Sequence, residues 1–249
     1  MLIQPLLDKL TQLRLPAFRD GLQEQLNHPK YADLAFEERL ALLVDQECTH
    51  RCQHRIERRI KQAGFPQPAS IEDLDLSPSR GLDRRFVLEL AQSIWVASHL
   101  NTIVLGPTGA GKTFLISALG LSACRNGYSV RYFRTSRLFY QLAQSHLDGS
   151  FPSLLTSLAR LDLLILDDWM RDPVSAANAQ DLLEVLDDRY GRVSTLVASQ
   201  VPVADWFARF PDPTVGDGVL DRIIHNTYRL ILSGDSLRKT HAPILMSTT

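Results

Sequence analysis

The sequence predicts an α/β fold with a five-stranded parallel sheet, preceded by a small all-helical domain. Three observations predict it. Five short apolar runs alternate with helical patterns after residue 100, as in sheets wound by helices. A glycine-rich turn joins the first of these runs to a helix, and residues 1–63 show only helical periodicity. With 249 residues, the chain is long enough for one large domain and a smaller one.

The first 63 residues are expected to form the helical domain. One amphipathic segment reaches about Leu15, Pro16 opens a second that runs to about Asn27, and a long helix starts near Phe36. Residues 64–82 are rich in Pro, Ser and Gly, which favours a linker. The second domain is therefore expected at 83–249, beginning with a helix over 83–98 whose N-cap is Asp83.

The five strands are expected where the apolar runs are richest in β-forming residues. They lie at 102–105, 130–133, 163–166, 195–198 and 229–232. Ligands of such sheets gather at the carboxyl ends of the strands.

The stretch GPTGAGKTF follows the first of these strands and fits the phosphate-binding loop G-x-x-x-x-G-K-[ST]. Backbone N–H groups and the positive end of the next helix face one point there, where a phosphate binds. The lysine reaches the outer phosphates and the threonine hydroxyl ligates Mg²⁺. The residues expected to contact nucleotide are Gly106, Pro107, Thr108, Gly109, Ala110, Gly111, Lys112, Thr113 and Phe114.

Two adjacent carboxylates end the buried strand LDLLILDDW. Asp167 is expected to hold Mg²⁺ through its waters, and Asp168 to orient or deprotonate the attacking water. The alternative is that both acids cap a helix that begins near Ala176. None of the five lysines follows an asparagine, so the guanine-reading motif Asn-Lys-x-Asp is absent and ATP is the expected nucleotide.

The net charge of −1 does not indicate nucleic-acid binding, so such a role must depend on a local patch. The long helix offers one, because its helical spacing places Arg51, Arg55, Arg58 and Arg59 on one face. These arginines are candidate DNA contacts. The alternative is a solvated basic face balanced by neighbours such as Glu57.

The motifs together resemble the AAA+ ATPases of the DnaA, DnaC and IstB branch, and the similarity to IstB-type helper ATPases of insertion sequences covers almost the whole chain. The similarity is carried by segments from both predicted domains. They are LRLPAFRDGLQEQL, RRIKQAGFP, ASIEDLDLS, LDRRFVLELA, GPTGAGKT, LLILDDW, DLLEVLDDRYGR, SQVPVADWF, LDRIIHNTYRL and GDSLRK.

The resemblance implies further site residues. Ser199 corresponds to the first sensor of the γ-phosphate, with Gln200 as the alternative. Arg222 corresponds to the arginine finger that acts on a neighbouring subunit's ATP. The alternative for Arg222 is a surface ion pair with Asp221 or Asp217. Arg238 is a weaker candidate for phosphate contact, and no C-terminal lid is evident.

Two positions depart from the family pattern. Asp168 stands where most AAA+ enzymes have glutamate, so slow hydrolysis is expected. Met170 stands where the family usually has glycine, which affects the local turn.

The resemblance implies an ATPase that assists transposition, with ATP and Mg²⁺ as cofactors. Its expected partners are duplex DNA, a transposase and further copies of itself that share ATP sites, with hydrolysis resetting the assembly. The alternatives are a DnaC-type helicase loader and a non-hydrolysing ATP switch that acts as a scaffold. The absence of a long apolar run and the three cysteines favour the cytoplasm over a membrane or an oxidising compartment.

Overall fold

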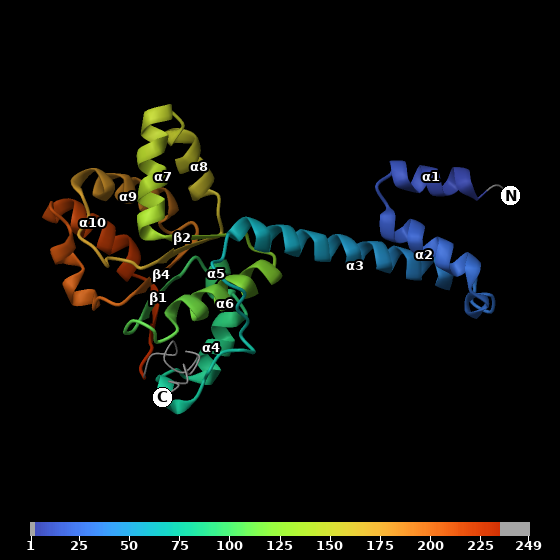
Figure 1. Ribbon diagram of the computed structural model, residues 1–249, viewed down its shortest axis with the longest axis horizontal. Coiled ribbons are helices and arrows are strands. Elements are labelled where there is room, and N and C mark those ends of the chain that lie inside the picture. The colour runs from blue at the N-terminus through green and yellow to red at the C-terminus, as the bar shows by residue number, and fades with distance from the viewer. Residues whose placement is uncertain (1–2, 235–249) are drawn as a thin grey trace, which may run out of the picture. The chain divides into compact units, whose positions relative to one another are not determined.

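The computed structural model describes residues 3–234, which form two compact units (Figure 1). One unit extends to Arg58, and the other begins at Arg59. The division falls within a single helix, so it lies a few residues before the boundary expected from the sequence.

The smaller unit consists of helices. These are α1 (Gln4–Gln12), α2 (Pro16–Asn27), the 3₁₀ helix η1 (Pro29–Tyr31) and α3 (Phe36–Ala63). The chain turns between α1 and α2 at Arg14, whose φ is +57°. Helices α2 and α3 approach closely, because a Cβ added to Gly21 would lie 2.9 Å from Leu43 Cδ2. Although α3 has 28 residues, no helix in residues 3–234 is long and apolar enough to cross a membrane.

The larger unit contains the predicted five-stranded parallel sheet, in the order β2-β3-β4-β1-β5. The strands are β1 (Asn101–Leu105), β2 (Val130–Arg134), β3 (Leu163–Asp167), β4 (Ser194–Ser199) and β5 (Thr227–Ile231). The positions of all five strands are confirmed to within two residues at each end.

Helices cover both faces of the sheet (Figure 1). They are α4 (Arg84–Ala91), α5 (Ile94–Ala97), α6 (Lys112–Arg125), α7 (Thr135–Asp148), α8 (Phe151–Ala159), α9 (Ala176–Arg189) and α10 (Pro213–Ile224). The connecting segments contain three 3₁₀ turns, η2 (Pro78–Arg80), η3 (Val203–Asp205) and η4 (Phe207–Arg209).

Alternate strand residues point into two separate cores, as the period of two requires. On β1, Val104 packs with the core under α4 to α6, whereas Ile103 packs with the core under α7 to α10. On β3, Ile165 and Leu166 divide in the same way. Both faces of the central strands are therefore buried, and their sequences are apolar throughout.

The helix expected over 83–98 is broken into α4 and α5. Asp83 caps the first part as expected, since its side chain accepts a hydrogen bond from the Arg85 N–H. Ser93 then adopts a left-handed conformation with φ of +60° and ends the helical run. The Asn126 side-chain amide donates to the Ser93 hydroxyl at 3.1 Å, which ties this break to the end of α6.

Residues 64–82 are not a free linker, in contrast to the expectation from their composition. Ala69, Ile71 and Leu82 are buried in the core beside α6. Phe65 also packs there, so closely that a Cβ on Gly120 would lie 2.6 Å from its ring. This segment is part of the larger unit and, as described below, forms one wall of its main cavity.

Candidate functional site

The glycine-rich loop lies where the sequence predicted it, between β1 and the N-terminus of α6. Gly111 precedes the helix with φ of +98°, a conformation that side chains rarely adopt. A Cβ on Gly106 would lie 2.8 Å from the Leu232 carbonyl oxygen. The first glycine is therefore needed for close approach to the chain after β5, and the last for the turn into the helix.

The Lys112 ammonium lies inside this loop. Its Nζ donates to the carbonyl oxygens of Gly106 at 2.7 Å and Pro107 at 2.9 Å. These bonds fix the lysine side chain against the backbone of the loop. A phosphate that binds there can take over part of this hydrogen bonding, and the gain is larger because both partners are then charged.

Asp167 ends β3 and is only 2% exposed. Its Oδ2 accepts hydrogen bonds from the Thr113 hydroxyl at 2.7 Å and from the Tyr132 phenol at 2.8 Å, and its Oδ1 accepts one from the Asp168 N–H at 2.9 Å. Burial raises the pKa of Tyr132, and the adjacent Asp167 carboxylate raises it further, so the phenol stays protonated and donates. The carboxylate is thus fixed beside the loop threonine.

Asp168 starts a tight turn in which two non-glycine residues have positive φ: Asp168 at +54° and Met170 at +53°. The left-handed conformation at Met170 explains why glycine suits this position. The buried Trp169 between them donates its backbone N–H to the Ala198 carbonyl at 2.8 Å, anchoring the turn to β4. The Asp168 carboxylate is partly exposed and lies 3.3 Å from the Arg171 guanidinium.

The two acids do not cap α9. The helix begins at Ala176, and the Ser175 hydroxyl is the cap, because it accepts a hydrogen bond from the Asn178 N–H at 3.2 Å. The alternative that Asp167 and Asp168 serve this helix is therefore wrong.

The two candidate sensors at the end of β4 are placed differently from each other. Ser199 is fully buried, donates to the Trp169 carbonyl at 2.6 Å and accepts from the Val201 N–H at 3.0 Å. Gln200 is exposed, lines the cavity and accepts a hydrogen bond from the Thr108 hydroxyl. This geometry corrects the preference for Ser199, whose hydroxyl is occupied in fixing the turn after Asp168.

We predict that Gln200→Ala slows ATP turnover by about tenfold and leaves ATP binding within a few fold of wild type, as expected if this cavity-lining amide is the sensor of the γ-phosphate. Ser199→Ala instead lowers the free energy of unfolding by about 1–3 kcal/mol, since it leaves buried groups unpaired. Steady-state kinetics and denaturant unfolding of both variants check this. If folded Ser199→Ala loses more ATP turnover than Gln200→Ala does, the choice of Gln200 over Ser199 as the sensor is wrong.

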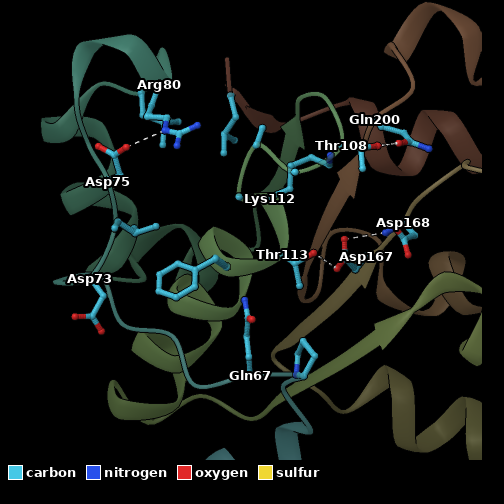
Figure 2. Close-up of a pocket in the computed structure, with 18 of the residues that line it drawn as sticks. Gln67, Asp73, Asp75, Arg80, Thr108, Lys112, Thr113, Asp167, Asp168 and Gln200 are labelled. Carbon is cyan, nitrogen blue, oxygen red and sulfur yellow. Dashed lines mark hydrogen bonds and ion pairs between the residues drawn. The ribbon is translucent and has the colours of Figure 1, made fainter. Parts of the chain in front are cut away.

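These groups surround one cavity of about 660 Å³ (Figure 2). The loop residues Thr108–Thr113 and Phe114 line it together with Asp167, Asp168 and Gln200. Figure 2 shows Lys112 and Thr113 between the two acids on one side and Asp75 and Arg80 on the other.

The cavity includes residues that the sequence analysis missed. Asp73, Asp75 and Arg80 come from the supposed linker, and Arg134 comes from the end of β2. Arg80 donates to Asp75 at 2.9 Å, and this bond, together with hydrogen bonds from Ser77, lowers the pKa of Asp75 to about 2. The position of Arg134 at a strand's carboxyl end was a usable signal. The spacing of apolar residues in ASIEDLDLS could likewise have indicated that the segment at 64–82 packs within the larger unit.

Arg222 does not line this cavity. It lies in the last turn of α10, where its Nε donates to Asp187 Oδ1 on α9 at 2.5 Å and its Nη1 donates to the Gly218 carbonyl at 3.1 Å. Asp221, one of the two ion-pair partners expected from the sequence, does pair with Arg222, at 3.7 Å, but the shorter ion pair is with Asp187, which was not expected.

The four arginines of α3 that are candidate DNA contacts differ in their surroundings. Arg51 is bound within the helical unit, because its Nε donates to Glu47 at 2.8 Å and its Nη2 to the Arg14 carbonyl at 2.9 Å. Arg55 and Arg58 are exposed, whereas Arg59 is partly buried and belongs to the larger unit. Arg238 lies outside the described residues.

Comparison with known sequences also indicates an ATP-binding protein. Residues 8–243 match the family described as IstB-like ATP binding protein. The chain belongs to this family. An insertion-sequence ATP-binding protein of Sinorhizobium fredii is 40% identical over 96% of this chain and 98% of its own length. A second relative, the ATP-binding protein of the insertion sequence IS1162 of Pseudomonas fluorescens, is 44% identical over 86% of this chain and 95% of its own length.

Solved structures extend the comparison to the fold. AMPPCP-bound DnaA from Aquifex aeolicus matches 69% of this chain and 52% of its own with a TM-score of 0.58 at 18% identity. The DnaC helicase loader matches 66% of this chain and 97% of its own with a TM-score of 0.55 at 19% identity. The family member described here therefore has the P-loop AAA+ fold, and the family and the geometry of the loop identify it as an ATPase.

Proposed function

We propose that this protein is an ATP-dependent helper of transposition that assembles on target duplex DNA, remodels it and recruits or stimulates a transposase, with hydrolysis resetting the assembly. The observation that carries this proposal is that the loop, both acids and Gln200 line the same cavity, in a chain whose 40–44% identical relatives belong to insertion sequences. These relatives favour a transposition helper over a helicase loader.

ATP binds with its phosphates in the loop, where the N-terminus of α6 and Lys112 offset their charge. Thr113 and Asp167 place a hydroxyl and a carboxylate oxygen 2.7 Å apart, and Mg²⁺ prefers such oxygen ligands. These residues fit Mg²⁺, which when bound offsets negative charge on the phosphate oxygens. Asp168 orients and deprotonates the attacking water, and Gln200 contacts the γ-phosphate.

Arg222 completes the site of a neighbouring subunit. Arg222 does not line the cavity of its own chain, so a contact with ATP requires the nucleotide of another subunit, where a guanidinium stabilises charge on the transferring phosphoryl group. An assembly in which each ATP lies between two subunits makes hydrolysis depend on assembly.

Mixing two inactive variants tests the shared site. Lys112→Ala subunits retain Arg222 but cannot hold ATP, and Arg222→Ala subunits hold ATP but lack the finger. We expect each alone to turn over ATP at about 1% of wild type or less, and the mixture to recover a readily measured fraction of wild-type turnover. Failure to recover, with both variants folded and assembling with wild type, would reject the shared site.

The DNA contact is proposed for the exposed part of the α3 basic face, Arg55 and Arg58. Arg51 is engaged with Glu47 and Arg14, so it stabilises the helical unit. Arg59 packs in the other unit, near Cys124. Two exposed guanidiniums suit contacts to phosphates on unrelated sequences.

Replacing Arg55 and Arg58 together with alanine is expected to weaken binding to unrelated duplexes by similar factors. The slope of log affinity against log salt should flatten by about 0.9 for each phosphate that the variant no longer neutralises. Fluorescence anisotropy over a salt series measures this, with Arg160→Ala, which removes one exposed arginine at the end of α8, as the control for a charge lost elsewhere. An unchanged slope in the folded double variant would move the DNA contact to the larger unit.

A further inference from the structure

The surroundings of Arg222 indicate that a second residue sets its orientation. An arginine side chain has many rotamers, and fixing one of them costs conformational entropy. The Arg222 side chain is 30% exposed, yet two of its three nitrogens are held by groups of the same chain. The arrangement therefore fixes the guanidinium before any neighbour arrives.

The contacts come from two helices. Nε is held by Asp187 near the end of α9, at 2.5 Å, and Nη1 by the Gly218 carbonyl one turn earlier on α10, at 3.1 Å. Helices α9 and α10 pack closely against each other, because a Cβ added to Gly218 would lie 3.0 Å from Leu183 of α9. Asp187 thus ties the arginine to a closely packed pair of helices.

The remaining nitrogen is the one suited to a phosphate. Nη2 makes no hydrogen bond or ion pair to any group in residues 3–234. The guanidinium has five N–H donors, and the two on Nη2 are left to bind an outside oxygen. Asp221 lies 3.7 Å from Nη1 but also pairs with His225 at 3.1 Å, so it fixes the arginine less directly than Asp187 does.

We propose that Asp187 is the positioning residue of the arginine finger: it holds Nε so that Nη2 of Arg222 is presented to the terminal phosphate of ATP on a neighbouring subunit. This inference rests on the proposed role of Arg222 in trans. It differs from a surface ion pair that merely stabilises the fold, which would act alike in every subunit.

The mixed assembly separates these roles, because the finger is needed only in the subunit that donates it. Asp187→Asn is placed either in the Lys112→Ala subunit, which donates the finger, or in the Arg222→Ala subunit, which receives it. We expect the recovered turnover to fall about tenfold when the donor carries Asp187→Asn, since misplacing a catalytic group is costly. The same change in the receiver should leave turnover unaltered, and the KM for ATP should stay the same in both mixtures.

Two further variants in the donor sharpen the test. Asp188→Asn makes the same charge change at the next, exposed residue of α9 and should leave turnover unaltered. Asp187→Glu, which keeps the carboxylate, should recover part of the loss. Equal losses in donor and receiver, or no loss in either, would overturn the role of Asp187 and leave the shared site standing. If the parent mixture of Lys112→Ala and Arg222→Ala recovers nothing, the shared site itself fails and the inference falls with it.

Discussion

Replacing Lys112 with alanine is expected to abolish ATP binding at micromolar nucleotide, with an affinity loss of about 100-fold or more. The ammonium that now donates to Gly106 and Pro107 lies in the loop that we propose holds the phosphates. Hydrogen bonds between charged groups contribute about 1.5–3 kcal/mol each, so removing one or two of them accounts for this factor. Titration with a fluorescent ATP analogue measures the affinity.

The matched control is Lys61→Ala, which removes the same charge at the exposed end of α3. It should bind ATP like the wild type. The thermal unfolding of Lys112→Ala without nucleotide should stay close to that of the wild type, because the bonds of the lysine to Gly106 and Pro107 lie within the loop itself. ATP binding by folded Lys112→Ala within a few fold of wild type would mean that this loop does not hold the nucleotide.

Asp168→Asn is expected to keep ATP binding and to slow hydrolysis by about 100-fold or more, because an amide cannot take a proton from water. The carboxylate faces both the cavity and Arg171, and its removal leaves Asp167 and the loop in place. Single-turnover hydrolysis, measured beside equilibrium ATP binding, separates the two effects.

Asp172→Asn supplies the comparison in the same turn. Asp172 also pairs with Arg171, at 2.9 Å, but does not line the nucleotide cavity. Its variant should hydrolyse ATP within about threefold of wild type, as expected for the loss of an exposed ion pair. Turnover of Asp168→Asn close to that of Asp172→Asn would remove Asp168 from the mechanism.

The sheet and the phosphate loop could be predicted because their signals are local. Strands buried on both faces have continuous apolar sequences, as LLIL before Asp167 does, and the loop has fixed glycine and lysine spacing. Thr113 and Asp167 were both expected at one magnesium site, and they lie together because the start of α6 and the end of β3 meet at the carboxyl edge of the sheet.

The expectations that the structure corrects concern features whose conformation depends on contacts between residues far apart in the sequence. Residues 64–82 have the composition of a linker, but Ile71 and Leu82 are buried in a core formed with distant helices, which the composition of the segment does not indicate. The apolar spacing after Asp83 continues past Ser93, whereas the left-handed conformation of Ser93 and its hydrogen bond from Asn126, 33 residues away, break the helix. Ser199 and Gln200 are adjacent, and the pleat of β4 together with the turn at Trp169 determines which one reaches the cavity.

The partners of the arginines also could not be predicted from local sequence patterns. Helical spacing groups Arg51 with Arg55 and Arg58, but the Arg14 carbonyl that binds Arg51 comes from 37 residues away. Asp187 is likewise 35 residues from Arg222, so no local pattern connects them. Long-range partners of surface charges depend on how the helices pack.

Whether ATP joins the subunits into assemblies on DNA can be measured by counting the subunits bound. Mass photometry would count the subunits on a duplex of fixed length in the presence of the non-hydrolysable analogue AMPPCP, without nucleotide, and with Lys112→Ala. The shared-site account predicts complexes of several subunits with the analogue, and only sparse, single-subunit binding in the other two samples. Identical subunit counts in all three samples would show that nucleotide does not join the subunits, and would contradict the account.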